Sequence, residues 1–357
     1  MPATVASFKI DFHQFLAADG QLISEDVPPL AKDMDKLRAL YRLMVTTRAF
    51  DKKAVALQRT GKMGTYASCL GHEAAHVSIG NAMQPEDCFA PSYREYGAQF
   101  CRGVKMSEVL TYWGGDERGS DYSGPRHDFA WCVPIATQCM HAAGAALAFK
   151  LRKEKRVAVA TIGDGGSSKG DFLEAINAAS AFQLPLVLVI VNNQWAISVP
   201  RSKQNSAKTL AQKGIAGGLP SIQVDGNDII VCHWAMEQAI EQARAGKGPT
   251  IIEMITYRLA DHTTADDARR YREDEEVENA WQLEPVKRLR KYLQSRGGWD
   301  DKKELELLAE ADREVEAAVK DYQAVSKPTT ESMFDHLFAN LPAEIEAQRA
   351  RALQERS

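Results

Sequence analysis

Two short apolar segments near the middle of the chain limit its fold more than any other feature. Residues 157–162 (VAVATI) and 186–191 (LVLVIV) are almost continuously apolar, which is typical of parallel strands buried on both faces. Between them lie a glycine-rich turn, 163–170 (GDGGSSKG), and a segment with helical spacing, 171–182, which Pro185 ends. This strand–helix–strand order over about 35 residues predicts a βαβ unit in a parallel sheet.

The sequence on both sides of this unit predicts further strands and helices. Apolar positions over 33–60 fall on one helical face, and Gly61 suits the end of that helix. Residues 222–224 and 250–255 have the character of strands, with a helix near 229–245 between them. We therefore predict an α/β fold in which helices flank a parallel sheet.

Three regions are predicted along the chain. Pro28 and Pro29 interrupt residues 1–32, which we expect to be an irregular N-terminal arm. Residues 33–325 form the predicted α/β domain, and residues 326–357 a helical C-terminal tail.

Two polar segments within the domain are predicted to face solvent. Residues 113–125 (WGGDERGSDYSGP) are rich in Gly, Asp and Ser, which indicates an exposed loop. Residues 269–278 (RRYREDEEVE) are dense in charge, and a solvated face or loop is the simplest interpretation.

The composition excludes several classes of protein. The chain has 44 basic and 48 acidic residues, and this net charge of −4 argues against nucleic-acid binding and polybasic membrane binding. No apolar run approaches the roughly 18 residues of a membrane span, and the N-terminus lacks a signal-peptide core. The six cysteines form no C-x-x-C pair, which favours reduced thiols over zinc or a disulfide scaffold. We expect a cytoplasmic protein.

Polar side chains follow each of the two central strands. Asp164 comes directly after the first strand, and Asn193 follows the second. If the strands are neighbours, both side chains lie at the carboxyl edge of the sheet, where open α/β sheets bind ligands. Their oxygens suit Mg²⁺, and Gly165 and Gly166 let the backbone approach a phosphate. The geometry therefore predicts a magnesium–diphosphate site.

The common nucleotide fingerprints do not match this turn. Ser168 stands where the Rossmann pattern G-x-G-x-x-G needs its third glycine, and no Gly-Lys-Ser/Thr follows as in a Walker A loop. Two other classes stay open at this point. One is a nicotinamide-dependent oxidoreductase on a Rossmann sheet, and the other is a non-catalytic assembly subunit with a helical tail.

The spacing of Gly163-Asp164-Gly165 and Asn192-Asn193 resembles the thiamine diphosphate motif. The whole stretch 163–199 resembles the α subunit of the E1 component of 2-oxo acid dehydrogenase complexes. Further matching segments are GHEA at 71–74, SYREYG at 92–97, IATQ at 135–138, VDGND at 224–228 and TYRLADHTTADDARRYR at 256–272. The resemblance covers roughly residues 37–340 and implies a thiamine diphosphate-binding fold.

The resemblance also implies roles for individual residues. Asp164, Asn193 and the main-chain oxygen of Trp195 match the magnesium ligands of the family. Tyr93 and Arg94 match a pair that contacts the diphosphate, for which the planar guanidinium fork is well suited. The remaining matches are Gly163, Gly165 and Gly166 along the diphosphate, Val133 and Ile135 around the aminopyrimidine, and His262, the catalytic histidine on a loop near the diphosphate. A histidine there can donate to a phosphate or move protons.

Two segments depart from the family pattern. Residues 132–138 resemble a potassium-binding turn of branched-chain members, with Cys132 in place of a serine, so K⁺ is an additional cofactor to test. Thr263 follows His262 where animal relatives carry a regulatory serine, so the resemblance does not extend to control by a dedicated kinase, and we do not predict such control. The other histidines are interpreted as structural or surface residues: His13, His72, His76, His127, His141, His233 and His336.

The resemblance implies oxidative decarboxylation of a 2-oxo acid and reductive acylation of a lipoyl group on the E2 acyltransferase. Because a glutamate of the E1 β subunit completes the site in two-subunit members, we expect an α₂β₂ heterotetramer. The segment GTYASCLGHEA (64–74) and residues 206–226 resemble pyruvate-specific chains, whereas IATQ and DHTTADD resemble branched-chain members. We therefore expect pyruvate dehydrogenase, with branched-chain 2-oxo acids as the alternative substrates.

Overall fold

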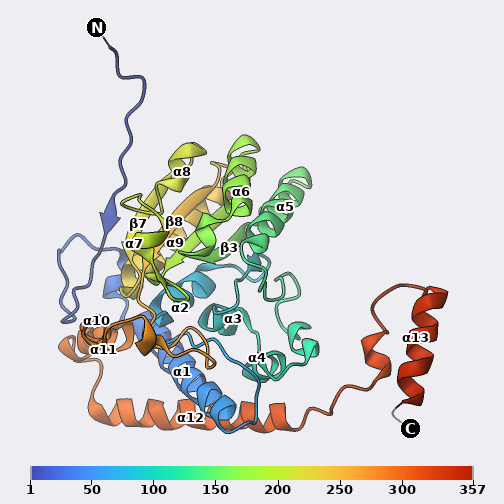
Figure 1. Cartoon of the computed structure of the whole chain (residues 1–357). Coiled ribbons are helices and arrows are strands. Elements are labelled where there is room, and N and C mark those ends of the chain that lie inside the picture. Colours follow the sequence, from blue (N-terminus) through green and yellow to red (C-terminus); the bar gives the residue numbers. More distant parts are fainter. Residues whose placement is uncertain (1, 356–357) are drawn as a thin grey trace.

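The computed structural model describes residues 2–355, and a parallel sheet forms the centre of this part of the chain (Figure 1). Its six strands lie in the order β1-β7-β8-β4-β3-β2, and every neighbouring pair is parallel. They are β1 (Phe12–His13), β2 (Cys88–Ala90), β3 (Ala158–Gly163), β4 (Leu186–Asn192), β7 (Ser221–Asp225) and β8 (Thr250–Ile255). An antiparallel hairpin, β5 (Trp195–Ala196) and β6 (Val199–Pro200), follows β4.

Helices flank the sheet, which confirms the predicted fold class (Figure 1). They are α1 (Met34–Arg59), α2 (Glu73–Ala82), α3 (Tyr96–Arg102), α4 (Met106–Trp113), α5 (Thr137–Leu151), α6 (Gly170–Ala181), α7 (Arg201–Gln204), α8 (Lys213–Ala216), α9 (Ile229–Arg244), α10 (Asp274–Trp281), α11 (Pro285–Ser295), α12 (Asp301–Gln323) and α13 (Ala343–Gln354). Short 3-10 turns lie at Pro29–Lys32, Glu117–Ser120, Gly166–Ser168, Ala268–Arg270 and Glu331–Met333.

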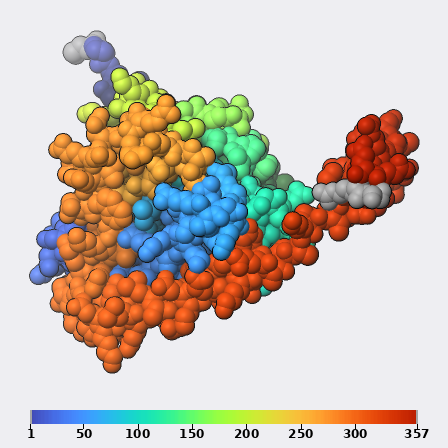
Figure 2. Space-filling view, turned by 60° about the horizontal axis from the view of Figure 1, so that its bottom comes forward, coloured from blue at the N-terminus to red at the C-terminus, as the bar shows by residue number. Residues whose placement is uncertain are grey.

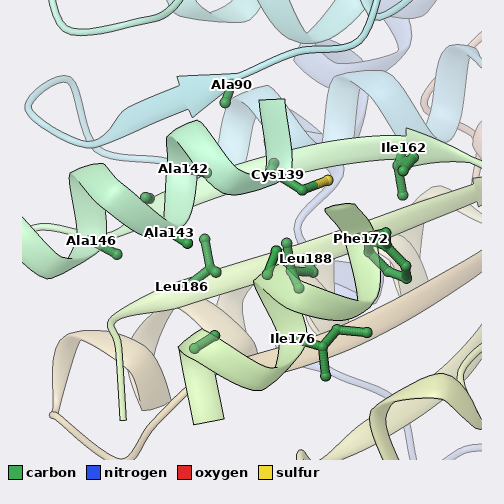
Figure 3. Close-up of a cluster of buried hydrophobic side chains, with 14 of the residues drawn as sticks. Ala90, Cys139, Ala142, Ala143, Ala146, Ile162, Phe172, Ile176, Leu186 and Leu188 are labelled. Carbon is green, nitrogen blue, oxygen red and sulfur yellow. The ribbon is translucent and has the colours of Figure 1, made fainter. Parts of the chain in front are cut away.

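The central strands are buried on both faces because side chains alternate across the sheet. Even-numbered residues of β3 and β4 pack under α5 and α6, and odd-numbered residues pack against α2 and α9. Figure 3 shows the first of these layers, in which Ala142 of α5 and Phe172 of α6 lie over Ile162 and Leu188. Small residues on α5 allow this helix to approach the sheet closely.

The predicted βαβ unit is present, and its strands are neighbours. In the β3–β4 ladder, Gly163 pairs with Val191, so both strands end at the same edge of the sheet. Asp164 and Asn193 therefore leave the sheet side by side, as the sequence predicted.

The N-terminal arm is more ordered than the sequence predicted. Residues 12–13 form the edge strand β1 beside β7. Two backbone N–H groups of the arm, those of Phe15 and Leu16, donate to the buried Asp228 carboxylate at 2.7 Å. The sequence prediction of an irregular arm missed this strand because two residues are too short for a periodic signal, while the rest of residues 2–28 forms no helix or strand.

The C-terminal tail extends away from the body of the molecule (Figures 1 and 2). Its helix α13 has no buried residue, whereas α12 packs along α1. The helical character predicted for the end of the chain is confirmed. The division into arm, domain and tail at residues 32 and 325 stays a prediction.

Both segments predicted to face solvent are partly buried. Within 113–125, Tyr122 packs against Trp131, and its hydroxyl accepts a hydrogen bond from Gln99 at 3.0 Å. Within 269–278, the Arg272 side chain is buried and donates to the carbonyl oxygen of Arg258. The sequence prediction missed both because a polar segment can bury single aromatic or arginine side chains.

No helix in residues 2–355 has the length and apolar character needed to cross a membrane. The cysteines, all within this part of the chain, are free thiols.

Candidate active site

A cavity of about 630 Å³ opens at the carboxyl edge of β3 and β4. Side chains from distant parts of the sequence line it, including residues near 93, 133, 164, 193 and 262. The structure brings every predicted site residue to this one cavity: Tyr93, Arg94, Val133, Ile135, Gly163, Asp164, Gly165, Gly166, Asn193, Trp195 and His262.

The Asp164 carboxylate is buried at the floor of this cavity. Burial raises its pKa, and hydrogen bonds to the carboxylate from the Gln204 side chain and the Asn193 backbone oppose that shift. The Gln204 amide donates to Oδ2 at 3.1 Å. No cationic side chain of residues 2–355 forms an ion pair with Asp164, although the charge of Arg258 also lowers its pKa, so this carboxylate has the chemistry to hold a divalent cation.

Asn193 and Trp195 lie on a tight turn directly after β4. The Asn193 side-chain oxygen accepts from the Trp195 backbone N–H at 3.2 Å. Between them, Gln194 has a φ of 73°, a left-handed conformation that a non-glycine residue adopts only when its surroundings hold it there. The turn thus places the Asn193 carboxamide in the same cavity as Asp164, and the Trp195 carbonyl oxygen that follows it accepts from Arg258 at 3.3 Å.

Two glycines directly after Asp164 shape the adjoining wall because neither position has room for a side chain. A Cβ on Gly165 would lie 2.5 Å from the Cβ of Ala196, and one on Gly166 would lie 2.9 Å from the Ile135 side chain. Such distances are too short for carbon atoms, so the backbone itself forms this wall. Exposed backbone N–H groups here suit an anionic group.

Arg94 and Arg258 supply positive charge to the same region. Both side chains are buried, and within residues 2–355 neither forms an ion pair with a carboxylate. Arg94 donates to the carbonyl oxygens of Ser68 and His262, and Arg258 donates to those of Trp195 and Ile197. The Nε of Arg258 has no hydrogen-bond partner among the described residues. Two buried guanidinium groups that form no ion pair with a carboxylate of residues 2–355 favour binding of a polyanion.

His262 lies between these two arginines. Arg94 contacts its Nδ1 at 3.3 Å and Arg258 at 3.5 Å. Since guanidinium groups only donate, Nδ1 must accept, which places the ring proton on Nε2. Burial, then the charges of Arg94 and Arg258, lower the pKa of His262 to about 3. In the cofactor-free chain this histidine is therefore a neutral hydrogen-bond donor.

Sequence reasoning missed several polar residues at this site, among them His72, His76, Lys169 and Gln204 on the cavity lining and Arg258 behind it. His72 and His76 are fully buried on the cavity wall, with their rings stacked at a centroid distance of 5.4 Å. The Nδ1 of His72 contacts the carbonyl oxygen of Cys69, whereas its Nε2 and both nitrogens of His76 have no partner in the described part of the chain. Arg258 lies within the matching segment 256–272, but the sequence does not show that its side chain turns toward His262.

The order His72-Glu73-Ala74-Ala75-His76 also has the spacing of a zinc-binding helix. The structure does not support a zinc site there. Glu73 points away from the cavity, where its carboxylate accepts from Arg48 and from the Gly71 backbone. Among residues 2–355, no three histidine, cysteine or acidic side chains gather around one point.

The burial of His72 predicts a pH-dependent stability. Burial and then the charge of Arg94 lower its pKa to about 3, whereas an unfolded histidine titrates near pH 6.5. Below pH 6.5 the unfolded chain binds a proton that the folded chain does not, so stability falls by about 1.4 kcal/mol per pH unit down to about pH 3. In His72→Gln, the free energy of unfolding of the isolated chain should depend less on pH between 6.5 and 4.

Urea denaturation at several pH values measures this difference. His127→Gln, at an exposed position, is the control and should keep the wild-type pH dependence. An equal slope in wild type and His72→Gln would contradict the buried, neutral state of His72.

The residues at this cavity fit a magnesium-bound organic diphosphate. Asp164, Asn193 and the Trp195 carbonyl provide hard oxygen donors, which Mg²⁺ prefers. Arg94 and the glycine backbone line the cavity and suit an anion, Arg258 adds positive charge behind them, and the apolar side chains of Val133 and Ile135 line the remaining wall. The unpaired nitrogens of Arg258 and His72 are polar groups that such a ligand can satisfy.

Comparison with known proteins gives the family context. Residues 41–331 match the family described as "Dehydrogenase E1 component". The chain is 41% identical over 342 residues to the 3-methyl-2-oxobutanoate dehydrogenase subunit alpha of Mycobacterium tuberculosis, covering 92% of each chain. It is 38% identical over 341 residues to the pyruvate dehydrogenase E1 component subunit alpha of Staphylococcus epidermidis, covering 95% of this chain and 92% of the relative. The Staphylococcus aureus protein of the same name has the same identity and coverage.

Proposed function

Since the chain belongs to the dehydrogenase E1 component family, we propose that it is the α subunit of the E1 component of a pyruvate dehydrogenase complex. In the proposed reaction pyruvate loses CO₂, and its acetyl group is transferred to the lipoyl disulfide of an E2 acyltransferase, which is reduced. The observation that carries this proposal is the convergence of Asp164, Asn193, Arg94 and His262 on one cavity at the edge of the sheet, with the buried Arg258 behind His262 and Trp195.

Thiamine diphosphate, when bound, supplies the carbanion that attacks the oxo carbon and the ring that takes up the electrons left by CO₂. The chain itself holds the diphosphate and Mg²⁺ and keeps water from the reacting atoms. Asp164, Asn193 and the Trp195 carbonyl are the proposed metal ligands. Tyr93 and Arg94 are proposed to bind the diphosphate together with Gly163, Gly165 and Gly166.

Val133 and Ile135 are proposed to contact the aminopyrimidine. Ile135 packs at the position where a side chain on Gly166 would lie, which supports its role as an apolar wedge under a bent cofactor. Val133 is half-exposed at the cavity, as expected if a further ligand or subunit covers it.

His262 is the proposed catalytic histidine. Its Nε2–H can donate to a phosphate or to the substrate, as the neutral ring in the cofactor-free chain supports. An anionic diphosphate beside it would raise its pKa again, because a nearby negative charge stabilises the imidazolium form. Proton transfer by His262 is therefore expected only in the loaded enzyme.

A potassium ion at residues 132–138 is a further proposal. The Gln138 side chain donates to the Thr161 carbonyl at 2.7 Å, and its own Oε1 is buried without a partner among residues 2–355. This unpaired oxygen supports a cation at the turn. The Cys132 thiol, which contacts the Pro134 carbonyl, is a poor replacement for a hydroxyl ligand of K⁺.

The proposed assembly is an α₂β₂ heterotetramer in the cytoplasm that acts with E2. We expect the chain alone to be inactive, because the carboxylate partner of the aminopyrimidine comes from the β subunit in the family it resembles. The branched-chain activity is the second candidate, since the relatives include a 3-methyl-2-oxobutanoate dehydrogenase subunit at similar identity.

One assay tests assembly and substrate together. The purified chain, with and without its cognate β subunit, is given pyruvate or 3-methyl-2-oxobutanoate and an artificial electron acceptor. We expect turnover only with β. The kcat/KM for pyruvate should be at least about 10-fold higher than that for 3-methyl-2-oxobutanoate, because a pocket can discriminate by this factor between substrates that differ by two methyl groups. Equal turnover by the chain alone would contradict the assembly, and preference for the branched acid would contradict the proposed substrate.

A further inference from the structure

A buried carboxylate, that of Glu253, lies beneath the metal donors and has no part in the function proposed above. Glu253 is on β8 and is fully buried. Three donors reach its two oxygens: Asn192 Nδ2 at 2.7 Å, the Ala211 backbone N–H at 3.0 Å and Gln223 Nε2 at 3.0 Å. Burying a charged carboxylate is costly unless hydrogen bonds compensate it, and these three donors supply that compensation.

The first donor connects Glu253 to the turn after β4. With its Nδ2 fixed by Glu253, the Asn192 side chain must point its oxygen at Gln194. That oxygen accepts from the Gln194 backbone N–H at 3.2 Å and from its side chain at 3.0 Å. Gln194 is the residue with the left-handed φ of 73°. Glu253 therefore holds, through Asn192, the strained turn that presents Asn193 and the Trp195 carbonyl.

The second donor connects Glu253 to the turn that carries Asp164. Ala211 belongs to the same short turn as Lys213, whose ammonium group donates to the carbonyl and hydroxyl oxygens of Ser167. The Ser167 hydroxyl in turn donates to the Asp164 carbonyl oxygen at 2.6 Å. Burial and Arg201 lower the pKa of Lys213, and the charge of Glu253 opposes this shift.

We propose that Glu253 is a positioning residue of the metal site: its carboxylate fixes the Asn193 turn and the Asp164 turn relative to each other. The spacing of the donors, and with it the affinity and size selectivity for the divalent cation, then depends on a residue that never touches the ion. This inference rests on the proposed function, because it assumes that Asp164, Asn193 and Trp195 bind Mg²⁺. Mg²⁺ requires short, near-octahedral coordination, so a small change of donor spacing affects it more than it affects the larger Ca²⁺.

Glu253→Gln tests the proposal with almost no change in shape. One of the two oxygens becomes an NH₂ group, which would face either the Asn192 amide or the Ala211 N–H, donor against donor. In the α/β assembly with thiamine diphosphate, EPR counting of free Mn²⁺ gives the metal affinity. We expect Glu253→Gln to bind Mn²⁺ at least about 10-fold more weakly, the scale found when groups behind metal ligands are changed.

Two further variants separate positioning from general stability. Asn192→Ser cuts the same connection at its other end and should weaken Mn²⁺ binding comparably, and the double variant should be no weaker than Glu253→Gln alone. Gln223→Met removes the third donor, which leads to neither turn, and should keep wild-type affinity. Competition with Ca²⁺ adds a measurement that a general loss of stability would not change. In Glu253→Gln and Asn192→Ser, the affinity for Ca²⁺ relative to that for Mg²⁺ should rise.

The outcomes are distinguishable. Wild-type assembly that binds no Mn²⁺ with thiamine diphosphate would overturn the proposed function itself. Wild-type binding with unchanged Mn²⁺ affinity and Ca²⁺ preference in folded Glu253→Gln would overturn only the role of Glu253. Should Glu253→Gln fail to fold, the same comparison with Asn192→Ser decides the question.

Discussion

Replacing Asp164 with asparagine should lower the activity of the reconstituted α/β pair by about 1,000-fold, on the scale of the several kcal/mol of charge stabilisation that a metal ion provides. The substitution keeps the shape of the side chain and its contact with Gln204 but removes the only charged oxygen donor among the three proposed ligands. Steady-state kinetics with pyruvate at increasing Mg²⁺ measures the loss. Added Mg²⁺ should restore part of the activity if the metal is held more weakly.

The same substitution should not weaken the cofactor-free fold. Burial raises the pKa of Asp164, so the folded chain binds a proton more readily than the unfolded chain. This carboxylate therefore costs stability as the pH rises through that raised pKa, and the neutral carboxamide of the Asp164→Asn variant would not carry this cost. The Tm of Asp164→Asn without cofactor should equal or exceed that of the wild type. Asp312→Asn, at an exposed position on α12, is the matched control for both activity and Tm.

Unchanged activity in Asp164→Asn would contradict the metal site and would favour an assembly subunit without catalysis. Lost activity together with a lowered Tm would indicate a structural role for the carboxylate instead.

Arg94→Gln should weaken binding of thiamine diphosphate about 100-fold, because hydrogen bonds to charged groups contribute about 1.5–3 kcal/mol each. Arg94→Lys keeps the charge but loses the planar fork, and should weaken binding by about 10-fold. Isothermal titration of the α/β pair with thiamine diphosphate at fixed Mg²⁺ measures both. Arg126→Gln, an exposed arginine paired with Asp121, is the control and should bind like the wild type.

Arg94→Gln should also change the titration of His262. The Arg94 charge lowers the pKa of His262 in the folded chain, and without it this pKa should rise. NMR of the histidine rings, with His262→Gln used to assign the resonance, would show the change. Equal cofactor affinity and equal His262 titration in wild type and Arg94→Gln would remove Arg94 from the proposed diphosphate site.

The central strands could be predicted because parallel strands buried on both faces are continuous apolar runs in the sequence. The predicted 157–162 and 186–191 differ from β3 and β4 by at most one residue at each end. The helix predicted over 33–60 also matches α1, whose N-terminus is capped by the Asp33 side chain. The two-residue strand β1 could not be predicted, since two residues cannot show a period of two.

The edge of the sheet where Asp164 and Asn193 meet follows from the same reasoning, because the βαβ unit places the ends of neighbouring parallel strands together. Tyr93, Arg94, Val133, Ile135, Trp195 and His262 could be named only through the resemblance. Nothing local in the sequence shows that a loop residue such as His262 folds back beside Arg94, 168 residues away.

His72, His76 and Arg258 mark the limit of sequence reasoning at this site. A histidine on an apolar helix is usually a satisfied core residue, and sequence cannot reveal that the nitrogens of His76 lack partners within residues 2–355. Glu253 was missed for a different reason. Within the strand TIIEMI, a single acidic residue gives no sign of the three donors that the fold brings to it.

A single divalent cation bound at once by Asp164, Asn193 and a diphosphate is the central claim. Pulsed ENDOR spectroscopy on the α/β pair with Mn²⁺ and thiamine diphosphate tests it most directly, because a large isotropic ³¹P coupling to Mn²⁺ arises only when phosphate oxygens coordinate the ion. We predict a ³¹P coupling in the wild type, together with a ¹³C coupling when aspartate is ¹³C-labelled at its carboxyl carbon, and loss of the ¹³C coupling in Asp164→Asn. Bound Mn²⁺ with no ³¹P coupling, or a ¹³C coupling that persists in Asp164→Asn, would contradict the account.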